Sequence, residues 1–288
     1  MSARAAGAWL AVAFAVLPLR ASAQEPEPIP ARDAPLWEFG LGLAGLRYPD
    51  YRGSDQSRNL VLPLPYFIYR GDFLRSDREG MRGVLFNNDR LDLNLSLGAS
   101  PPVSSNGSSA RSGMPDLKPS IELGPALDWT LWRGADPRSR LSLSLPVRGV
   151  VSVEASPRFL GWVATPRLNL DLPDRLLAPG WNWGWQAGAL FADQRQNAYY
   201  YTVDRAYATA ARPAYTAAGG YAGYQFTTAL SRRFPGWWVG AYLRYDSVAG
   251  AVFEGSPLVR SAHNLYAGVG FAVILDRSGV RVRARDDE

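Results

Sequence analysis

The sequence lacks cysteine and has a single histidine, His263, and a single lysine, Lys118. Without cysteine the chain can form no disulfide, no thiolate metal site and no cysteine nucleophile. One histidine also argues against a metal site built from several histidines. The net charge of +5 therefore rests on arginines scattered along the chain. Because these form no basic run with interleaved aromatic residues, we expect no nucleic-acid partner, and we assign no metal and no cofactor.

Long hydrophobic runs are also scarce. Although 47% of the residues are hydrophobic, the mean hydropathy is only −0.16. Beyond residue 23, no segment has the roughly 18 consecutive apolar residues of a membrane-spanning helix. These values exclude a bundle of membrane helices.

The first 23 residues are typical of a secretory signal peptide. Arg4 precedes an apolar stretch over residues 5–19, and residues 21–23 read Ala-Ser-Ala, an A-x-A cleavage pattern. A membrane anchor is the alternative, but the apolar stretch is short for a span. Residues 24–35 are rich in proline and polar residues, which predicts a flexible periplasmic lead-in.

What the sequence does contain is strand periodicity. In GWWVGAYLRYDS (236–247), alternate residues from Trp237 are all apolar with an aromatic at each end, and the residues between them become polar. The same period of two recurs in RLDLNLSLG (90–98), WNWGWQAGALFAD (181–193) and NLYAGVGFAVIL (264–275). Each run lasts about ten residues, whereas strands of soluble proteins usually have about five or six.

Soluble sandwiches and membrane barrels both alternate, and three features favour the barrel. These are the strand length, the aromatics near the ends of the apolar face, and an opposite face of Gly, Ser, Asn, Arg and Asp that suits a polar lumen. An open sheet edge cannot lie in hydrocarbon, so the sheet must close. We therefore predict an all-β fold: a closed antiparallel transmembrane β-barrel over residues 36–275, followed by a charged tail over 276–288.

The barrel is predicted to have about 12 strands, within a range of about 10 to 14. The ranges are 36–46, 59–69, 72–78, 82–87, 90–98, 119–132, 138–153, 158–171, 181–192, 222–232, 236–247 and 264–275. Every long connection follows an odd-numbered strand, as in outer-membrane barrels with long extracellular loops and short periplasmic turns. Five prolines inside these ranges each remove a ladder hydrogen bond unless they stand at a bulge or rim: Pro63, Pro65, Pro125, Pro146 and Pro166.

The alternation also assigns faces. Predicted to touch lipid are Trp183, Leu93, Leu143, Leu243 and Phe271. Predicted to avoid it are Asn94, Gln186, Arg244 and Gly268.

Four pieces of the sequence lie between or along the predicted strands in a particular order. They are YPDYRGSD (48–55), LPLPYFIYRGDFL (62–74), NAYYYTVDRAYATAARPAYTAAGG (197–220) and EGSPLV (254–259). In this order they resemble the MipA/OmpV family of Gram-negative outer-membrane proteins, over roughly residues 36–275. Two features depart from that family: the last strand does not end the chain on an aromatic residue, and loop 99–118 is longer and more serine-rich.

The resemblance implies a location in the cell outer membrane, in contact with its lipid, and two kinds of role. One branch of the family is described as a scaffold linking the lytic transglycosylase MltA to a bifunctional penicillin-binding protein. Other branches are described as surface antigens or adhesins. We therefore expect a non-enzymatic scaffold with murein hydrolase or synthase proteins as candidate partners. A small-solute channel and a surface adhesin are the alternatives, and no catalytic, cofactor or metal residue is carried over.

A lipid-modifying hydrolase is a further alternative. His263 lies in the last long loop, close in sequence to Ser256, Ser261 and Glu254. A general base needs a nucleophile within hydrogen-bond reach. A lone loop histidine is more often a plain surface residue.

Two other groups of residues are candidates for function. The tyrosines of the long loop 193–221 could form a binding platform, fold inward as a lid or lie at the headgroup belt of the membrane: Tyr199, Tyr200, Tyr201, Tyr207 and Tyr215. The charges on the lumen face could line a pore or pair with one another as an interior plug: Glu38, Glu122, Asp128, Arg148, Arg167, Asp171, Arg244 and Asp246. The narrow lumen of a barrel of this size favours the plug.

Overall fold

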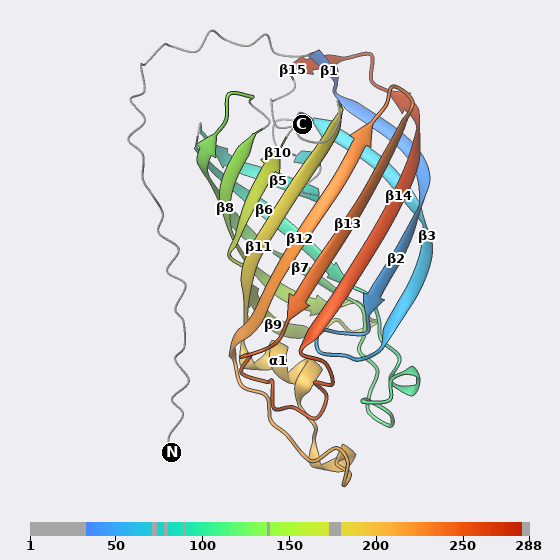
Figure 1. Ribbon diagram of the computed structural model, residues 1–288, viewed down its shortest axis with the longest axis vertical. Coiled ribbons are helices and arrows are strands. Elements are labelled where there is room, and N and C mark those ends of the chain that lie inside the picture. Colours follow the sequence, from blue (N-terminus) through green and yellow to red (C-terminus); the bar gives the residue numbers. More distant parts are fainter. Residues whose placement is uncertain are drawn as a thin grey trace, which may run out of the picture. The chain divides into compact units, whose positions relative to one another are not determined.

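The computed structural model describes residues 33–70, 74–77, 80–88, 90–136, 139–172 and 180–283. The predicted signal peptide and most of the lead-in lie outside these residues. Most of the described chain is β-strand, with one short α-helix (Figure 1). The strands of the large sheet are β2 (Trp37–Pro49), β3 (Ser57–Arg70), β4 (Leu74–Asp77), β5 (Gly80–Asn87), β6 (Leu91–Ser100), β7 (Ser120–Arg133), β8 (Arg140–Ser152), β9 (Phe159–Ala164), β10 (Arg167–Leu172), β11 (Trp181–Ala192), β12 (Gly220–Arg233), β13 (Trp237–Ser247) and β14 (His263–Arg277).

The sheet closes into an antiparallel barrel. Each strand from β2 to β9 pairs with the next, β10 to β14 do the same, and β14 pairs with β2. Both β9 and β10 also pair with β8 on one side and β11 on the other, which completes the ring. The predicted closure is therefore confirmed, and it is the arrangement that lets strands cross hydrocarbon without a free edge along most of the wall.

One predicted strand is interrupted. The range 158–171 divides into β9 and β10 at Thr165 and Pro166, because Pro166 has no N–H to continue the ladder. Its carbonyl still accepts from Ala189 N at 3.1 Å, so the two halves stay in line. Counting them as one wall element turns the 13 strands of the sheet into 12, the predicted number.

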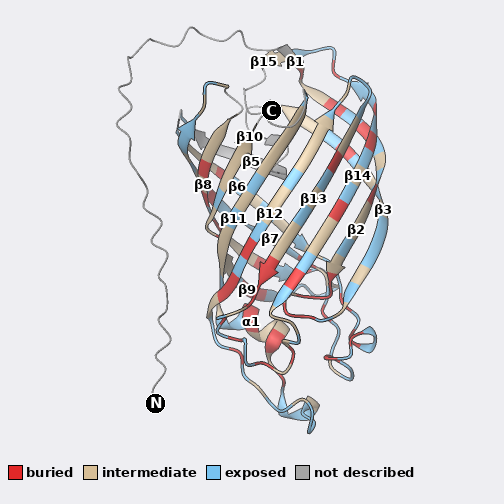
Figure 2. Ribbon diagram, viewed as in Figure 1, coloured by how far each residue is buried: buried red, intermediate tan, exposed pale blue. Residues whose placement is uncertain are grey.

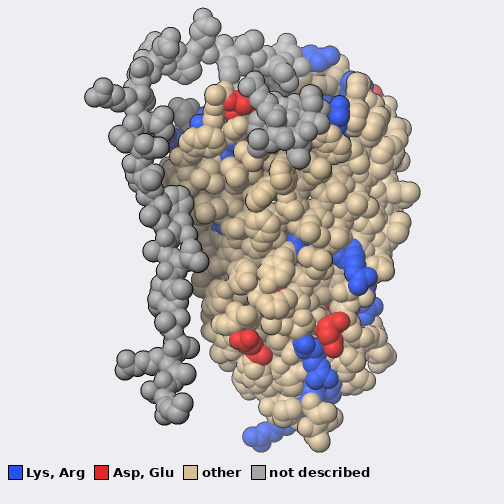
Figure 3. Space-filling model, viewed as in Figure 1, with Lys and Arg blue, Asp and Glu red and all other residues tan. Residues whose placement is uncertain are grey.

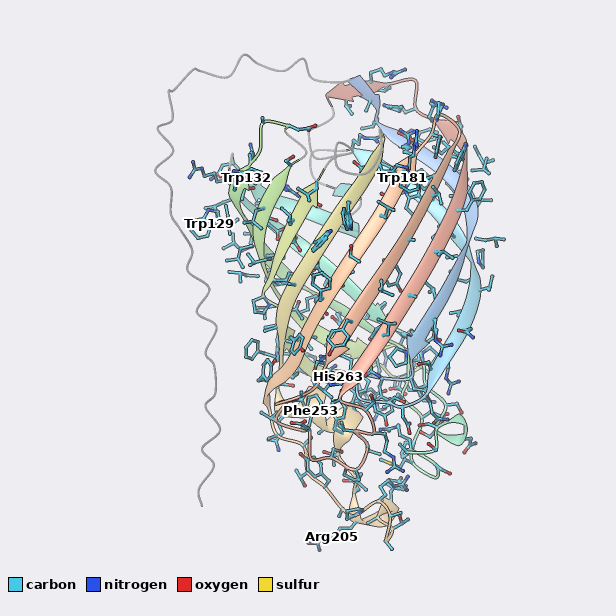
Figure 4. The ribbon with its side chains drawn as sticks, viewed as in Figure 1. Trp129, Trp132, Trp181, Arg205, Phe253 and His263 are labelled. Atoms are coloured by element: carbon cyan, nitrogen blue, oxygen red, sulfur yellow. The ribbon has the colours of Figure 1, made fainter. Side chains whose placement is uncertain are left out.

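Few charged side chains lie on the outer surface at the level of the strands in the view of Figure 3, and exposed residues recur along the strands in Figure 2. Leu43, Leu243 and Phe271 are 63%, 45% and 46% exposed, in rows of alternating exposure. Trp129 and Trp132 are exposed and lie toward the short-turn end of this band (Figure 4). Trp162 is also exposed and lies on β9, which contacts α1 at the long-loop end (Figure 1). A continuous apolar band between two aromatic girdles is the surface that a bilayer covers.

The predicted faces agree with the structure. Leu243 and Phe271 are exposed, whereas Asn94 is buried and donates to Asp128 at 2.5 Å. Gln186 bonds to Asn169 inside the barrel at 2.8 Å. Leu93 and Leu143 lie on the same face of their strands as the exposed Leu95 and Leu145. Trp183 lies on the same face of β11 as the exposed Trp185, and its indole donates to Thr228 at 2.6 Å.

The two ends of the barrel differ. Long connections gather at the end where α1 (Gln194–Tyr201) lies, which we call the long-loop end; the other is the short-turn end (Figure 1). At the short-turn end, β1 (Asp33–Pro35) pairs with β15 (Arg281–Arg283) in a separate two-stranded sheet. Parts of the predicted flexible lead-in and charged tail are thus ordered strands, because each satisfies the backbone of the other.

No helix in the described ranges is long and apolar enough to cross a membrane.

The outward assignment can be tested with one substitution on each face. Leu243→Arg places a charge in the apolar band, where arginine near the midplane costs about 2–4 kcal/mol. Thr227→Arg, one strand away, places the same side chain in the cavity lining of the lumen. We expect the folding yield in liposomes to fall for Leu243→Arg and to be largely kept for Thr227→Arg. Gly240 is not a neutral control, since a Cβ there would lie 2.5 Å from the Trp238 ring. Equal yields for the two arginine variants would contradict the assignment.

Candidate functional site

The long-loop end is closed by its own loops. We call the four connecting segments 50–56, 101–119, 193–219 and 248–262 the loop cap. Their buried side chains form one apolar cluster with Ala222 of β12, and every segment contributes to it: Tyr51, Val103, Leu117, Tyr201, Ala217, Val248, Ala251 and Phe253. A solvated loop rarely carries such a core, so these segments fold as a unit.

Stacked aromatic rings form the centre of the cap. The rings of Tyr201 and Phe253 lie parallel with centroids 3.7 Å apart, and Tyr51 meets Tyr201 edge-on at 6.2 Å. Phe253 is fully buried (Figure 4). Helix α1 presents Tyr201 at its last residue, and Asp193 caps the helix by accepting from Gln196 N at 2.8 Å.

Each polar group in this centre bonds across loops. Tyr51 donates to Leu258 O at 2.7 Å, and Ser256 donates to Tyr201 O at 2.7 Å. Tyr201 donates to Arg52 O at 2.9 Å. Because these partners come from three different loops, no loop can leave without exposing polar groups that the others satisfy.

A buried carboxylate joins the cap to the barrel wall. Asp246 on β13 is fully buried and accepts from Arg52 Nε at 3.0 Å and from Arg244 Nε at 2.6 Å. Arg52 also donates to Ala222 O at 2.8 Å. Gly223 leaves room for the guanidinium, since a Cβ there would lie 2.9 Å from Arg52 Nη2. One carboxylate between two guanidiniums holds loop 50–56 against the strands.

A second set of bonds ties loop 101–119 to loop 193–219. Arg111 is 3% exposed and donates to Tyr200 O at 2.8 Å, and burial lowers the pKa of its guanidinium. Tyr199 accepts from Lys118 N at 2.6 Å. Arg212 donates to Ala110 O at 3.0 Å.

The tyrosines of loop 193–221 therefore act as a lid. Tyr199, Tyr200 and Tyr201 fold onto the cap, and Tyr215 packs against two of its clusters. The segment around Tyr207 instead projects beyond the cap with Arg205, at the far end of the molecule (Figure 4). Of the sequence interpretations, the inward-folded lid is the one that Tyr199, Tyr200, Tyr201 and Tyr215 adopt.

Most charges predicted in the lumen are paired. Glu38 is fully buried between Arg70, at 3.0 Å, and Arg233. The other pairs are Glu122 with Arg148 at 3.1 Å, Asp171 with Arg140 at 3.6 Å, Asp128 with Asn94, and Asp246 with Arg244. This favours the interior plug over a charged pore, because most of these charges meet an opposite charge inside the barrel, while Asp128 accepts from the neutral amide of Asn94.

Ser256, Ser261 and Glu254 do not hydrogen-bond to the ring of His263. The His263 Nδ1 lies 2.7 Å from the hydroxyl of Tyr245 on the outer face. Ser261 donates to the carbonyl of His263 at 2.6 Å rather than to its ring. Glu254 accepts from Gly250 N at 2.8 Å, and Ser256 donates to Tyr201 O in the loop cap. Among the described residues, no group of three or more His, Asp or Glu could hold a metal.

Two cavities lie inside the barrel. The cap-side cavity, of about 670 Å³, lies beneath the loop cap and is lined by residues that include Tyr201 and Phe253. The turn-side cavity, of about 590 Å³, includes Asn169, Thr227 and Trp238 in its lining. Both volumes fall within the range of roughly 300–1,000 Å³ usual for small-molecule sites.

Sequence reasoning missed the residues that hold the cap together. Arg52 and Asn264 are the clearest cases, since Asn264 accepts from Gly53 N at 2.6 Å and donates to Ser54 O at 2.7 Å. The sequence feature that pointed to these residues is the segment YPDYRGSD, which contains Tyr51 and Arg52. Its role could not be read locally, because its partners lie roughly 200 residues away.

Comparison with known proteins gives one family match. The model of the family described as MltA-interacting protein MipA matches residues 41–273. No curated protein matches. Of the solved structures, 15 chains match. One is the P. putida toluene transporter TodX, with 13% identity over 85% of this chain and 68% of that chain and a TM-score of 0.28. A TM-score this low carries no argument about fold or function.

The cap can be loosened at its aromatic centre. Phe253→Ala removes a fully buried ring, which costs about 3–5 kcal/mol in a packed core. We expect trypsin then to cleave after the buried Arg111, while the exposed Arg205 is cleaved in every variant. Val252→Ala, at a residue 39% exposed, is the matched control. Continued protection of Arg111 in Phe253→Ala would show that the ring does not hold the cap closed.

The cap should also respond to high pH. Burial raises the pKa of Tyr51 to about 12 and pushes that of Tyr201 still higher. The neutral phenol of Tyr51 therefore stabilises the cap fully below about pH 10, and this contribution is lost as the pH rises through about 12. We expect the phenolate absorbance of the unaltered chain minus that of Tyr51→Phe to titrate near pH 12. A difference titrating near pH 10 would place Tyr51 in solvent.

Proposed function

We propose, from the premise that the chain belongs to the MltA-interacting protein (MipA) family, that it is a non-enzymatic scaffold of the outer membrane. Its partner would be a murein-remodelling enzyme of the kind the family description names, the lytic transglycosylase MltA. The long-loop end would face the cell exterior and the short-turn end the periplasm, as in other barrels of this topology.

The observation that carries this proposal is the ordered sheet at the short-turn end. The sheet of β1 and β15 lies outside the barrel wall and brings two distant parts of the chain together (Figure 1). Leu36 N donates to Val280 O at 2.9 Å and Ser278 N donates to Trp37 O at 2.9 Å, which fixes this sheet to β2. Val280 is 60% exposed. An ordered surface with an apolar residue facing the periplasm suits a protein partner.

The closed structure of the long-loop end also supports placing the partner at the short-turn end. The polar and aromatic groups at the centre of the cap bond to one another. A closed cap and paired lumen charges speak against a permanently open channel. The contacts of His263 with Tyr245, and of Ser256 with Tyr201, speak against catalysis at this end.

Binding of purified MltA to the full chain in detergent tests the proposal. Val280→Glu places a charge on the β15 surface, and Val252→Glu places the same charge on an exposed valine of the opposite end. We expect Val280→Glu to weaken binding by at least about tenfold, the equivalent of about 1.4 kcal/mol at a binding anchor. Val252→Glu should bind like the unaltered chain.

Two results would count against it. If MltA does not bind the unaltered chain, the scaffold role for this partner is wrong. If both valine variants bind normally, the partner uses a surface other than the β1–β15 sheet.

A further inference from the structure

Two arginines and one aspartate lie together at the wall of the cap-side cavity. Asp246 accepts from Arg52 Nε at 3.0 Å and from Arg244 Nε at 2.6 Å. Both arginines line the cavity, and their side chains are mostly buried. We call these three residues the arginine cluster. Because one carboxylate carries a single negative charge, the cluster has one positive charge in excess.

The other carboxylates of the cavity do not balance this charge. Among the described residues that line the cavity, the carboxylates are Asp50 and Glu122. Asp50 pairs with Arg58, and Glu122 meets Arg148 at 3.1 Å. A buried charge without a counter-charge is costly, because little water is left to replace its hydration. The cavity wall therefore favours an anion.

Arg244 is held in place with one nitrogen left for a ligand. Its Nε and Nη2 both donate to Asp246 at 2.6 Å, and the guanidinium lies over the ring of Tyr266, 4.7 Å from the centroid. Within the described ranges, Nη1 has no hydrogen-bond partner, and the side chain lines the cavity. A guanidinium that is already oriented binds a carboxylate without losing further side-chain freedom.

A second donor lies beside Arg244. Tyr242 precedes Arg244 by two residues on β13, so both side chains lie on the lumen face. Gly268 is the partner of Tyr242 on β14, and its missing side chain leaves room for the tyrosine ring against the wall. The Tyr242 hydroxyl has no hydrogen-bond partner among the residues that the structure describes. It is therefore available to donate to an anion bound at Arg244.

The rest of the cavity suits an apolar group. Leu46 of β2, Val163 of β9 and Leu190 of β11 contribute apolar side chains to its lining. The volume of about 670 Å³ is far larger than a simple inorganic ion requires, and it falls within the range usual for small organic ligands. The lining thus combines an anion site with an apolar surface.

We propose that the cap-side cavity binds a small organic carboxylate, with its charged group at Arg244 and Tyr242 and its apolar body against Leu46 and Leu190. The bound carboxylate supplies the counter-charge that the arginine cluster lacks. This goes beyond the scaffold role, because it gives the barrel interior a ligand of its own. The loop cap then serves as the cover of the binding site.

Three probes test the ligand class on the unaltered chain. The full chain in phospholipid nanodiscs is brought to dialysis equilibrium with phenylbutyrate, with its neutral amide phenylbutyramide or with acetate, and binding to empty nanodiscs is subtracted. We expect phenylbutyrate to bind at least about tenfold more tightly than either of the others. The amide lacks the charge, and acetate lacks the apolar body.

Two results with these probes would overturn the proposal. If phenylbutyrate does not bind, or binds no better than its amide, the arginine cluster does not need an anion from solution. If acetate binds as tightly as phenylbutyrate, the site takes simple anions and the apolar lining plays no part. Both results are obtained without any substitution, so they do not depend on the folding of a variant.

A substitution of glutamine by glutamate tests the position of the site. Gln225 lines the cavity and pairs with Asp246 across β12 and β13. Gln225→Glu adds the missing negative charge at nearly constant shape, so we expect it to weaken phenylbutyrate binding by at least about tenfold, or about 1.4 kcal/mol. Gln194→Glu makes the same change at an exposed residue of α1 outside the cavity lining, and it should bind like the unaltered chain.

Protection of Arg111 from trypsin reports that the cap is closed in both variants. Normal phenylbutyrate binding by Gln225→Glu with Arg111 protected would show that the anion is not held at the arginine cluster. Equal weakening in Gln225→Glu and Gln194→Glu would contradict the proposal as well, because the effect would then not depend on a position in the cavity.

Discussion

The need to pair every backbone group that lies in hydrocarbon governs this molecule. It requires the strands to form a ring, and the ring is completed where β9 and β10 share β8 and β11 as neighbours. It also explains how Pro166 is accommodated, because the wall is interrupted for two residues, Thr165 and Pro166, and resumes in the same register.

The interior follows a related rule for charge. Carboxylates and guanidiniums that face the lumen are brought together, and the most buried of them, Glu38 and Asp246, each meet two arginines. Removing one partner of such a group would leave a buried charge uncompensated, which costs more than the pair contributes. These groups therefore fix the relative positions of strands and loops rather than line a route for ions.

Three of the four segments that resemble the family meet in the loop cap. Residues 48–55 supply Tyr51 and Arg52, residues 197–220 supply Tyr201, and residues 254–259 supply Ser256 and Leu258. The fourth, 62–74, begins within β3. The family resemblance therefore rests mainly on parts of the chain that close one end of the barrel, whereas the proposed scaffold surface lies at the other end.

The sequence alone determined the fold class, the strand number and which side chains face outward, because alternation with a period of two is a local property that each strand carries by itself. It also placed the lumen charges and the lid tyrosines on the correct elements. It could not determine that Asp246 joins Arg52 to Arg244, or that Asn264 holds Gly53 and Ser54. Those facts depend on which strand or loop becomes a neighbour across about 200 residues of sequence, and only closure of the barrel decides that. The sequence also could not identify the hydrogen-bond partner of the His263 ring. The adjacent strand determines that partner, which is Tyr245 rather than a serine or a carboxylate.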